Sequence, residues 1–196
     1  MTSVLHVTSS VRQNGSASLS GGHAVIERLQ TRHETLTVTT RTVSDEAAFL
    51  TEDWVGASFT PADERTLNQH AILATSDAMV HELLDADILV ISASMYNFGL
   101  PAALKAWVDH VARPGVTFRP DPVQTYVGLA TGKTAYIVVA TGETPVMGDM
   151  DFVSPYLVHV LGFLGLTDVH VIAADMTVVD PATLDSRVAE QIDALF

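Results

Sequence analysis

The apolar run at residues 88–91, Ile-Leu-Val-Ile, limits the possible folds more than any other part of the chain. Because the run is short and has no polar alternation, it is typical of a strand buried on both faces of a parallel sheet. A helix then opens at Leu100 and Pro101, where proline is tolerated because the first helical turn needs no amide hydrogen. The loop between strand and helix reads Met95, Tyr96, Asn97, Phe98 and Gly99. A strand that passes through such a loop into a helix predicts an α/β sheet.

The same alternation of strand and helix runs along the whole chain. The apolar patterns predict strands at residues 4–8, 35–41, 88–93, 135–140 and 167–173. Five strands that alternate with helices predict a right-handed, doubly wound parallel sheet. A chain of 196 residues suits one domain with one substantial core. We therefore expect a single flavodoxin-like domain over residues 1–196, with strand order 2-1-3-4-5.

Three loops, at residues 9–18, 95–98 and 140–144, follow the first, third and fourth strands. Ligands of open α/β sheets bind outside the carboxyl ends of the strands, so we expect these loops to line one crevice. Aromatic rings and an amide at 95–98 suit a flat heteroaromatic ligand, and the alternative is a plain connection capped by Asn97. The Gly-x-Gly-x-x-Gly fingerprint is absent, which favours FMN over FAD or tightly held NAD.

A hydroxyl-rich turn precedes the first helix, with serines at Ser10, Ser16 and Ser18. The free amides and positive dipole end of a helix N-terminus stabilise a phosphate dianion, and serine hydroxyls can donate to its oxygens. The alternative is ordinary capping of the helix by Ser16 or Ser18.

Two segments together carry a family resemblance: Met-Tyr-Asn-Phe at 95–98 and Ala-Arg-Pro-Gly-Val-Thr-Phe at 112–118. At this spacing they resemble the FMN-dependent NADH:azoreductase and NAD(P)H:quinone oxidoreductase family. The resemblance implies an FMN-dependent enzyme that takes electrons from NADH or NADPH. It further implies ping-pong transfer to quinones or azo compounds, and a homodimer with the flavin near the interface. No catalytic side chain and no metal is then expected, because the flavin supplies the reactivity.

The resemblance also assigns residues to the cofactor. The expected FMN-binding residues are Ser10, Ser16, Ala17, Ser18, Met95, Tyr96, Asn97, Phe98, Ala140, Thr141, Gly142 and Glu143. Arg12 suits the FMN phosphate or a 2′-phosphate on the donor, or stays solvated.

The chain departs from the family pattern at three places. Ala17 stands where a polar residue is common. Glu143 follows a turn that lacks the family's arginine, which lowers the flavin potential unless the carboxylate points away. Pro120 replaces an aromatic residue in the loop at 119–127, so we expect Phe118 or Tyr126 to serve the substrate instead. These departures leave two alternatives, an FMN-binding sensor or carrier with little turnover and a domain that has lost FMN.

Composition excludes several other classes. A net charge of −13 repels phosphate backbones, so nucleic acid is not an expected partner. No apolar run approaches the roughly 18–20 residues of a membrane-spanning helix, and the N-terminus lacks a basic leader, so we expect a cytoplasmic protein. The absence of cysteine excludes disulfides, thiolate metal sites and a cysteine nucleophile.

Five further expectations concern the helices and the segments around them. Residues 44–63 read as an irregular loop anchored by Trp54 and Phe59. His110 reads as a side chain facing solvent or a subunit partner. The last helix is expected to start at Asp180-Pro181, and the segment 156–164, apolar on nearly every side, to be buried by subunit contact. Helical spacing at Leu67, Ala71, Ala74 and Ala78 predicts a helix that continues to about Leu84.

Overall fold

The computed structural model describes residues 1–12, 14–45 and 48–196. Its centre is a five-stranded parallel sheet in the order β2-β1-β3-β6-β7. Counted along the chain within this sheet, that order is 2-1-3-4-5, so the expected topology is confirmed. The strands are β1 (Thr2–Thr8), β2 (Leu36–Thr42), β3 (Ile88–Ser94), β6 (Thr134–Ala140) and β7 (Asp168–Ala174).

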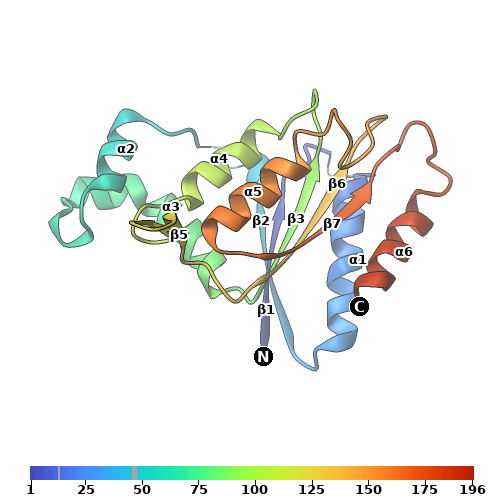
Figure 1. Cartoon of the computed structure of the whole chain (residues 1–196), viewed down its shortest axis with the longest axis horizontal. Coiled ribbons are helices and arrows are strands. Elements are labelled where there is room, and N and C mark those ends of the chain that lie inside the picture. Colours follow the sequence, from blue (N-terminus) through green and yellow to red (C-terminus); the bar gives the residue numbers. More distant parts are fainter. Residues whose placement is uncertain (13, 46–47) are drawn as a thin grey trace.

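Helices cover both faces of this sheet (Figure 1). The helices are α1 (Ala17–Arg32), α2 (Glu52–Phe59), α3 (Leu67–Asp85), α4 (Ala102–Val111), α5 (Ser154–Leu164) and α6 (Leu184–Leu195). One face carries α1 and α6, and the other carries α3, α4 and α5. In the described part of the chain, no helix has the length and apolarity needed to cross a membrane.

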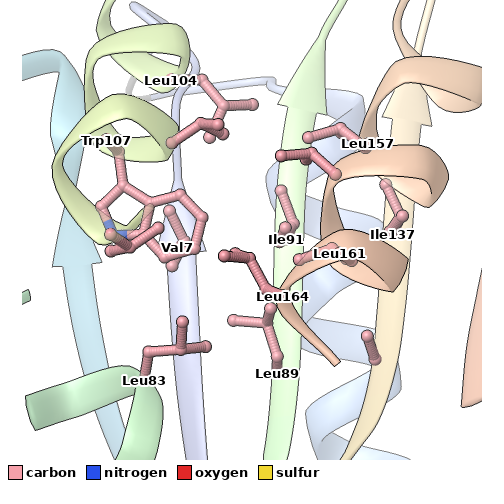
Figure 2. Packing of buried hydrophobic residues seen from close by; sticks show 14 of the residues in the cluster. Val7, Leu83, Leu89, Ile91, Leu104, Trp107, Ile137, Leu157, Leu161 and Leu164 are labelled. Atoms are coloured by element: carbon pink, nitrogen blue, oxygen red, sulfur yellow. The ribbon is translucent and has the colours of Figure 1, made fainter. Parts of the chain in front are cut away.

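The larger core cluster lies between the sheet and the face that carries α3, α4 and α5. Val7, Ile91 and Ile137 project from three neighbouring strands towards Trp107 of α4 and Leu157 of α5 (Figure 2). All five side chains are buried. Burying each such side chain contributes about 1.5–3 kcal/mol, so this layer fixes α4 and α5, and the loops that precede them, against the sheet.

On the opposite face, α1 packs unusually close to the strands. A Cβ atom on Gly22 would lie 2.1 Å from the Ser92 hydroxyl oxygen and 2.8 Å from His6 Nε2. Only glycine therefore fits at this position, because any side chain would clash with these two atoms. The close approach brings the start of α1 over the carboxyl ends of β1 and β3.

The helix expected after residue 66 is confirmed as α3, but the four residues that carried its spacing lie on its exposed side. Leu67, the first of the four positions, is 90% exposed, and the three alanines are exposed as well. Alanine is neutral enough to sit on either face, so its spacing did not mark the core. The buried positions are Leu73, Ser76, Met79, Val80 and Leu83.

The stretch at residues 44–63 holds more helix than expected, although residues 46 and 47 lie outside the described residues. It contains α2, whose N-cap Thr51 accepts a hydrogen bond from the Trp54 amide. Trp54 is buried, which confirms it as an anchor. Phe59 is 71% exposed, so its role as an anchor is wrong.

His110 is buried, so its expected exposure is wrong. Its Nε2 atom lies 2.9 Å from the Ala48 carbonyl oxygen. Its ring meets the Trp54 ring edge-on at a centroid separation of 5.3 Å. The short helix α2, which the sequence pattern did not reveal, therefore supplies the cover.

The structure also differs from the expectation at residues 119–127. The proline-rich loop forms an antiparallel hairpin of β4 (Phe118–Asp121) and β5 (Thr125–Gly128), in which Pro120 faces Tyr126. Both strands of a two-stranded hairpin are edge strands, where proline is tolerated.

The last two helices differ from the expectation as well. The last helix starts at Leu184 and not at Asp180. In α5, Val158 is exposed while Leu157 is buried. Burial of α5 by a subunit partner stays a prediction.

Candidate functional site

A cavity of about 620 Å³ opens where β1, β3, β6 and β7 end. This is the crevice outside the carboxyl ends of the strands, where ligands bind in folds of this kind. Eight of the expected cofactor residues line it: Ser10, Ser16, Ala17, Met95, Tyr96, Ala140, Thr141 and Gly142. Sites for small molecules and cofactors commonly measure about 300–1,000 Å³, so the volume suits a mononucleotide.

The start of α1 forms the first wall of the cavity. Ser16 is the N-cap and accepts a hydrogen bond from the Leu19 amide at 3.4 Å. The amides of Ala17 and Ser18 have no acceptor within the described residues, and they belong to the turn whose donors an α-helix leaves free. Such a turn is an anion site, so the capping role of Ser16 and phosphate binding are compatible.

Ser18 lies behind this wall and does not line the cavity. Its hydroxyl oxygen is 3.2 Å from those of Ser16 and Ser94, and the side chain is fully buried. This chain of three hydroxyls joins the first turn of α1 to the end of β3. Ser18 therefore supports the wall from behind through its side chain.

Ser10 and Arg12 complete the first wall. The Arg12 amide donates to the Ser10 hydroxyl at 3.1 Å, which holds the turn after β1. The Val11 amide donates to the Tyr96 hydroxyl at 3.3 Å and so ties this turn to the loop after β3. Arg12 and Asp185 are the two charged residues of the lining, so Arg12 supplies a local positive charge in a chain of net charge −13.

The loop after β3 reverses sharply at Asn97 and Phe98. Their φ angles are 49° and 68°, in the left-handed region, and the amides and carbonyls of Tyr96 and Gly99 bond each other at 3.1 Å. A left-handed phenylalanine costs roughly 1–2 kcal/mol, which the surrounding structure must offset. Both side chains are exposed outside the cavity lining, beside its mouth, whereas Met95 and Tyr96 lie inside.

The loop after β6 places Ala140, Thr141 and Gly142 along the cavity. The Met95 amide donates to the Ala140 carbonyl at 2.8 Å, so this loop and the loop after β3 are joined directly. Glu143 is exposed and does not belong to the lining. The departure from the family pattern at this position thus faces solvent.

A fourth wall was missed by sequence reasoning. Thr177, Val178 and Pro181 follow β7, and Leu184 and Asp185 open α6. The end of β7 had to meet the same sheet edge, and this signal was available in the predicted topology. The residues themselves carry no phosphate-like or aromatic pattern that would have singled them out.

Phe118 and Tyr126, expected to serve the substrate, lie on the β4–β5 hairpin away from the cavity lining. Their rings pack with Phe163 of α5, at centroid separations of 4.6 Å and 5.7 Å. Tyr126 is half exposed and Pro120 is exposed. Within one chain this aromatic cluster does not reach the cavity.

A buried polar group lies beneath the first wall. His6 of β1 is fully buried, and its Nε2 atom is 2.8 Å from the Ser92 hydroxyl oxygen. Burial lowers the pKa of His6 from 6.5 to about 4, and the nearby His23 contributes to this lowering. The Ser92 carbonyl accepts from both the amide and the hydroxyl of Ser9 at 3.1 Å. A neutral, buried imidazole therefore lies next to the end of β1, from which the chain continues into Ser9 and Ser10.

Comparisons with known proteins agree with this arrangement. A family model described as Flavodoxin-like fold matches residues 2–195. FMN-dependent NADH:quinone oxidoreductase 1 from Hahella chejuensis is 44% identical over 194 residues, which are 99% of this chain and 95% of that protein. The protein of the same name from a Jannaschia species is 44% identical over 195 residues, covering 100% of this chain and 99% of that protein.

Solved structures give the same fold. An azoreductase from Bacillus anthracis superposes with a TM-score of 0.86 at 22% identity, over 99% of this chain and 96% of that one. An FMN-dependent NADH-azoreductase from the same species, solved in complex with FMN, gives a TM-score of 0.86 at 19% identity, over 100% and 97%. At these identities the structural likeness supports the fold alone.

Proposed function

Since this chain belongs to the flavodoxin-like family of FMN-dependent NADH:quinone oxidoreductases, we propose that it binds FMN and passes two electrons from NADH or NADPH to quinones and azo compounds. The observation that carries the proposal is the convergence of four loops, each following a different strand, on one cavity that begins at the N-terminus of α1. That cavity combines an anion site with a broad neutral surface.

The donor set fits FMN. The amide of Ala17, with the hydroxyls of Ser10 and Ser16, would hold the phosphate, and Arg12 would balance part of its charge. Met95 and Tyr96 would cover the ring, and the turn at 140–142 would run along its edge. Bound FMN supplies the two-electron chemistry, and the protein orients it.

We further propose a ping-pong reaction, in which the electron donor leaves before the acceptor enters. What supports it is the cavity at this edge of the sheet, which donor and acceptor would have to use in turn. Initial rates measured with NADH varied at several fixed benzoquinone concentrations are expected to give parallel double-reciprocal lines. Lines that intersect would show that both substrates bind together and would overturn the mechanism.

The proposal includes a homodimer with the flavin near the interface. Phe98, Met150 and Phe152 are about half exposed or more, at 49%, 53% and 65%. The Phe152 amide donates to the Phe98 carbonyl at 3.2 Å, so two of them lie side by side. Exposed apolar patches of this kind mark interaction sites. Sedimentation equilibrium should give twice the 21.0 kDa chain mass, and a monomer at all concentrations would contradict the dimer.

A sensor or carrier with little turnover is the weaker alternative. It was motivated by Glu143 and Pro120, and both side chains are exposed and lie outside the cavity lining. Steady reduction of benzoquinone by the flavin-loaded protein would exclude it.

A further inference from the structure

Arg187 of α6 holds both ends of the loop that forms the fourth wall. Its Nη1 and Nη2 atoms donate to the carboxylate and the carbonyl of Asp175, at 2.8 Å and 2.9 Å. Its Nε atom donates to the Thr183 hydroxyl at 3.2 Å. Asp175 starts the loop after β7, and Thr183 ends it at the first turn of α6. One guanidinium thus sets the span of the whole loop.

Asp175 extends this connection to the loop after β6. While one carboxylate oxygen accepts from Arg187, the other accepts from the Val146 amide at 3.0 Å. The Asp175 side chain is 13% exposed and the Arg187 side chain 31%, so the carboxylate is the better shielded partner. The carboxylate therefore joins two loops that lie about thirty residues apart in the sequence.

The two loops meet along the cavity edge. The amides of Thr177 and Val178 donate to the carbonyls of Thr141 and Gly142, each at 3.1 Å. All four of these residues line the cavity, whereas Arg187 and Asp175 do not. The ion pair thus lies behind the wall and determines where its lining residues stand.

We propose that Arg187 and Asp175 are positioning residues for flavin binding, a clasp that holds the wall of residues 140–142 and 177–178 at the spacing the ligand needs. This inference rests on the proposed function. The planar guanidinium forms charge-assisted bonds in fixed directions, and an ammonium group at the same place cannot reproduce that fork.

The attachment of α6 to the sheet does not depend on this clasp. The Gln191 side chain accepts from the Ala173 amide at 2.9 Å and donates to the Ala173 carbonyl at 3.0 Å. Val188 and Ile192 are buried against the sheet as well. Loss of the Arg187 fork is therefore expected to loosen the loop and leave the helix in place.

The test is an equilibrium titration of flavin-free protein with FMN, followed by quenching of flavin fluorescence. Arg187→Gln should lower the affinity for FMN about tenfold, as the loss of a charge-assisted pair predicts. Arg187→Lys should recover only part of this loss. The affinity for riboflavin, which lacks the phosphate, should fall by the same factor, because the residues that this pair positions, at 140–142 and 177–178, belong to the part of the lining proposed for the ring and not for the phosphate.

Arg28→Gln is the matched control, because it breaks the ion pair between Arg28 of α1 and Asp193 of α6, far from the cavity lining. The affinity of this variant for FMN should stay within about twofold of the wild-type value. Equal weakening in both variants, or wild-type affinity in Arg187→Gln, would overturn the clasp. If Arg187→Gln fails to fold, Asp175→Asn gives the same test while keeping side-chain size. Failure of the wild-type protein to bind FMN would instead overturn the proposed function.

Discussion

Two walls of the cavity are built in opposite ways. The wall at the start of α1 is local: Ser10, Ser16 and the free amides of the first helical turn lie within ten residues. The wall after β7 is assembled from loops about thirty residues apart and held by Arg187 and Asp175. A wall made by helix geometry depends on the packing that seats the helix. A wall made by loops depends on the few side chains that tie them together.

The strongest effect concerns the packing beneath the local wall. Gly22→Ala would place a Cβ atom 2.1 Å from the Ser92 hydroxyl oxygen, so α1 must shift or the His6–Ser92 contact must break. We expect the free energy of unfolding to fall by about 3 kcal/mol, measured by urea denaturation. Gly56→Ala is the control, because nothing lies within 4 Å of its added Cβ atom and alanine favours the helix. A similar loss in both variants would contradict the packing argument.

The next effect is a pH dependence caused by His6. Its pKa is about 4 in the fold against an ordinary value of 6.5, so the unfolded chain binds more protons between these limits. The stability that His6 contributes is therefore complete above pH 6.5 and is lost as the pH falls towards 4. Between about pH 7 and pH 5 this amounts to about 2 kcal/mol, seen in the urea midpoint.

His6→Gln should remove most of this slope even if it lowers stability overall. The change His81→Gln, at an exposed histidine of α3, should retain the slope. An unchanged slope in His6→Gln would assign the pH dependence to other groups.

A smaller effect concerns Ser16, which belongs to the local wall itself. Ser16→Ala removes the N-cap of α1 and should lower the free energy of unfolding by about 1 kcal/mol. It should also weaken FMN more than riboflavin, because the phosphate loses a hydroxyl partner. Thr66→Ala removes the cap of α3 and should cost similar stability with no change in flavin affinity. If Ser16→Ala lowered the affinities for FMN and riboflavin equally, Ser16 would not be a partner of the phosphate.

The weakest effect is expected at Glu143, on a loop of the assembled wall but outside the lining. Because the carboxylate is exposed and screened by solvent, Glu143→Gln should change stability by less than about 0.5 kcal/mol. The midpoint potential of the bound flavin, measured by dye equilibration, should match that of the wild type. A clear rise in potential would show that Glu143 faces the ring in the flavin-bound state.

The contrast between the walls also explains what the sequence could reveal. The five strands and the sheet order followed from apolar runs and alternation, because a parallel sheet buries both of its faces. The start of α1 was visible because Ser16 is a cap that acts within its own turn. The loops at 95–98 and 140–142 followed from topology, since strand ends share one sheet edge.

Features that depend on distant partners were not visible. The helix α3 was visible from its spacing, but its buried side was not, because the alanines that carried the spacing suit either environment. His110 was placed at the surface because its cover, α2, was read as a loop. Arg187 and Asp175 are ordinary charged residues in the sequence, and their role arises only when β6 and β7 bring their loops together.

An anaerobic stopped-flow absorbance trace of the FMN-loaded protein tests the oxidoreductase function most directly, because it follows the reduction and re-oxidation of the flavin itself. Mixing with NADH should bleach the flavin band rapidly, and subsequent mixing with benzoquinone should restore it. Bound flavin that NADH does not reduce would contradict the oxidoreductase function while leaving the fold and the binding site intact.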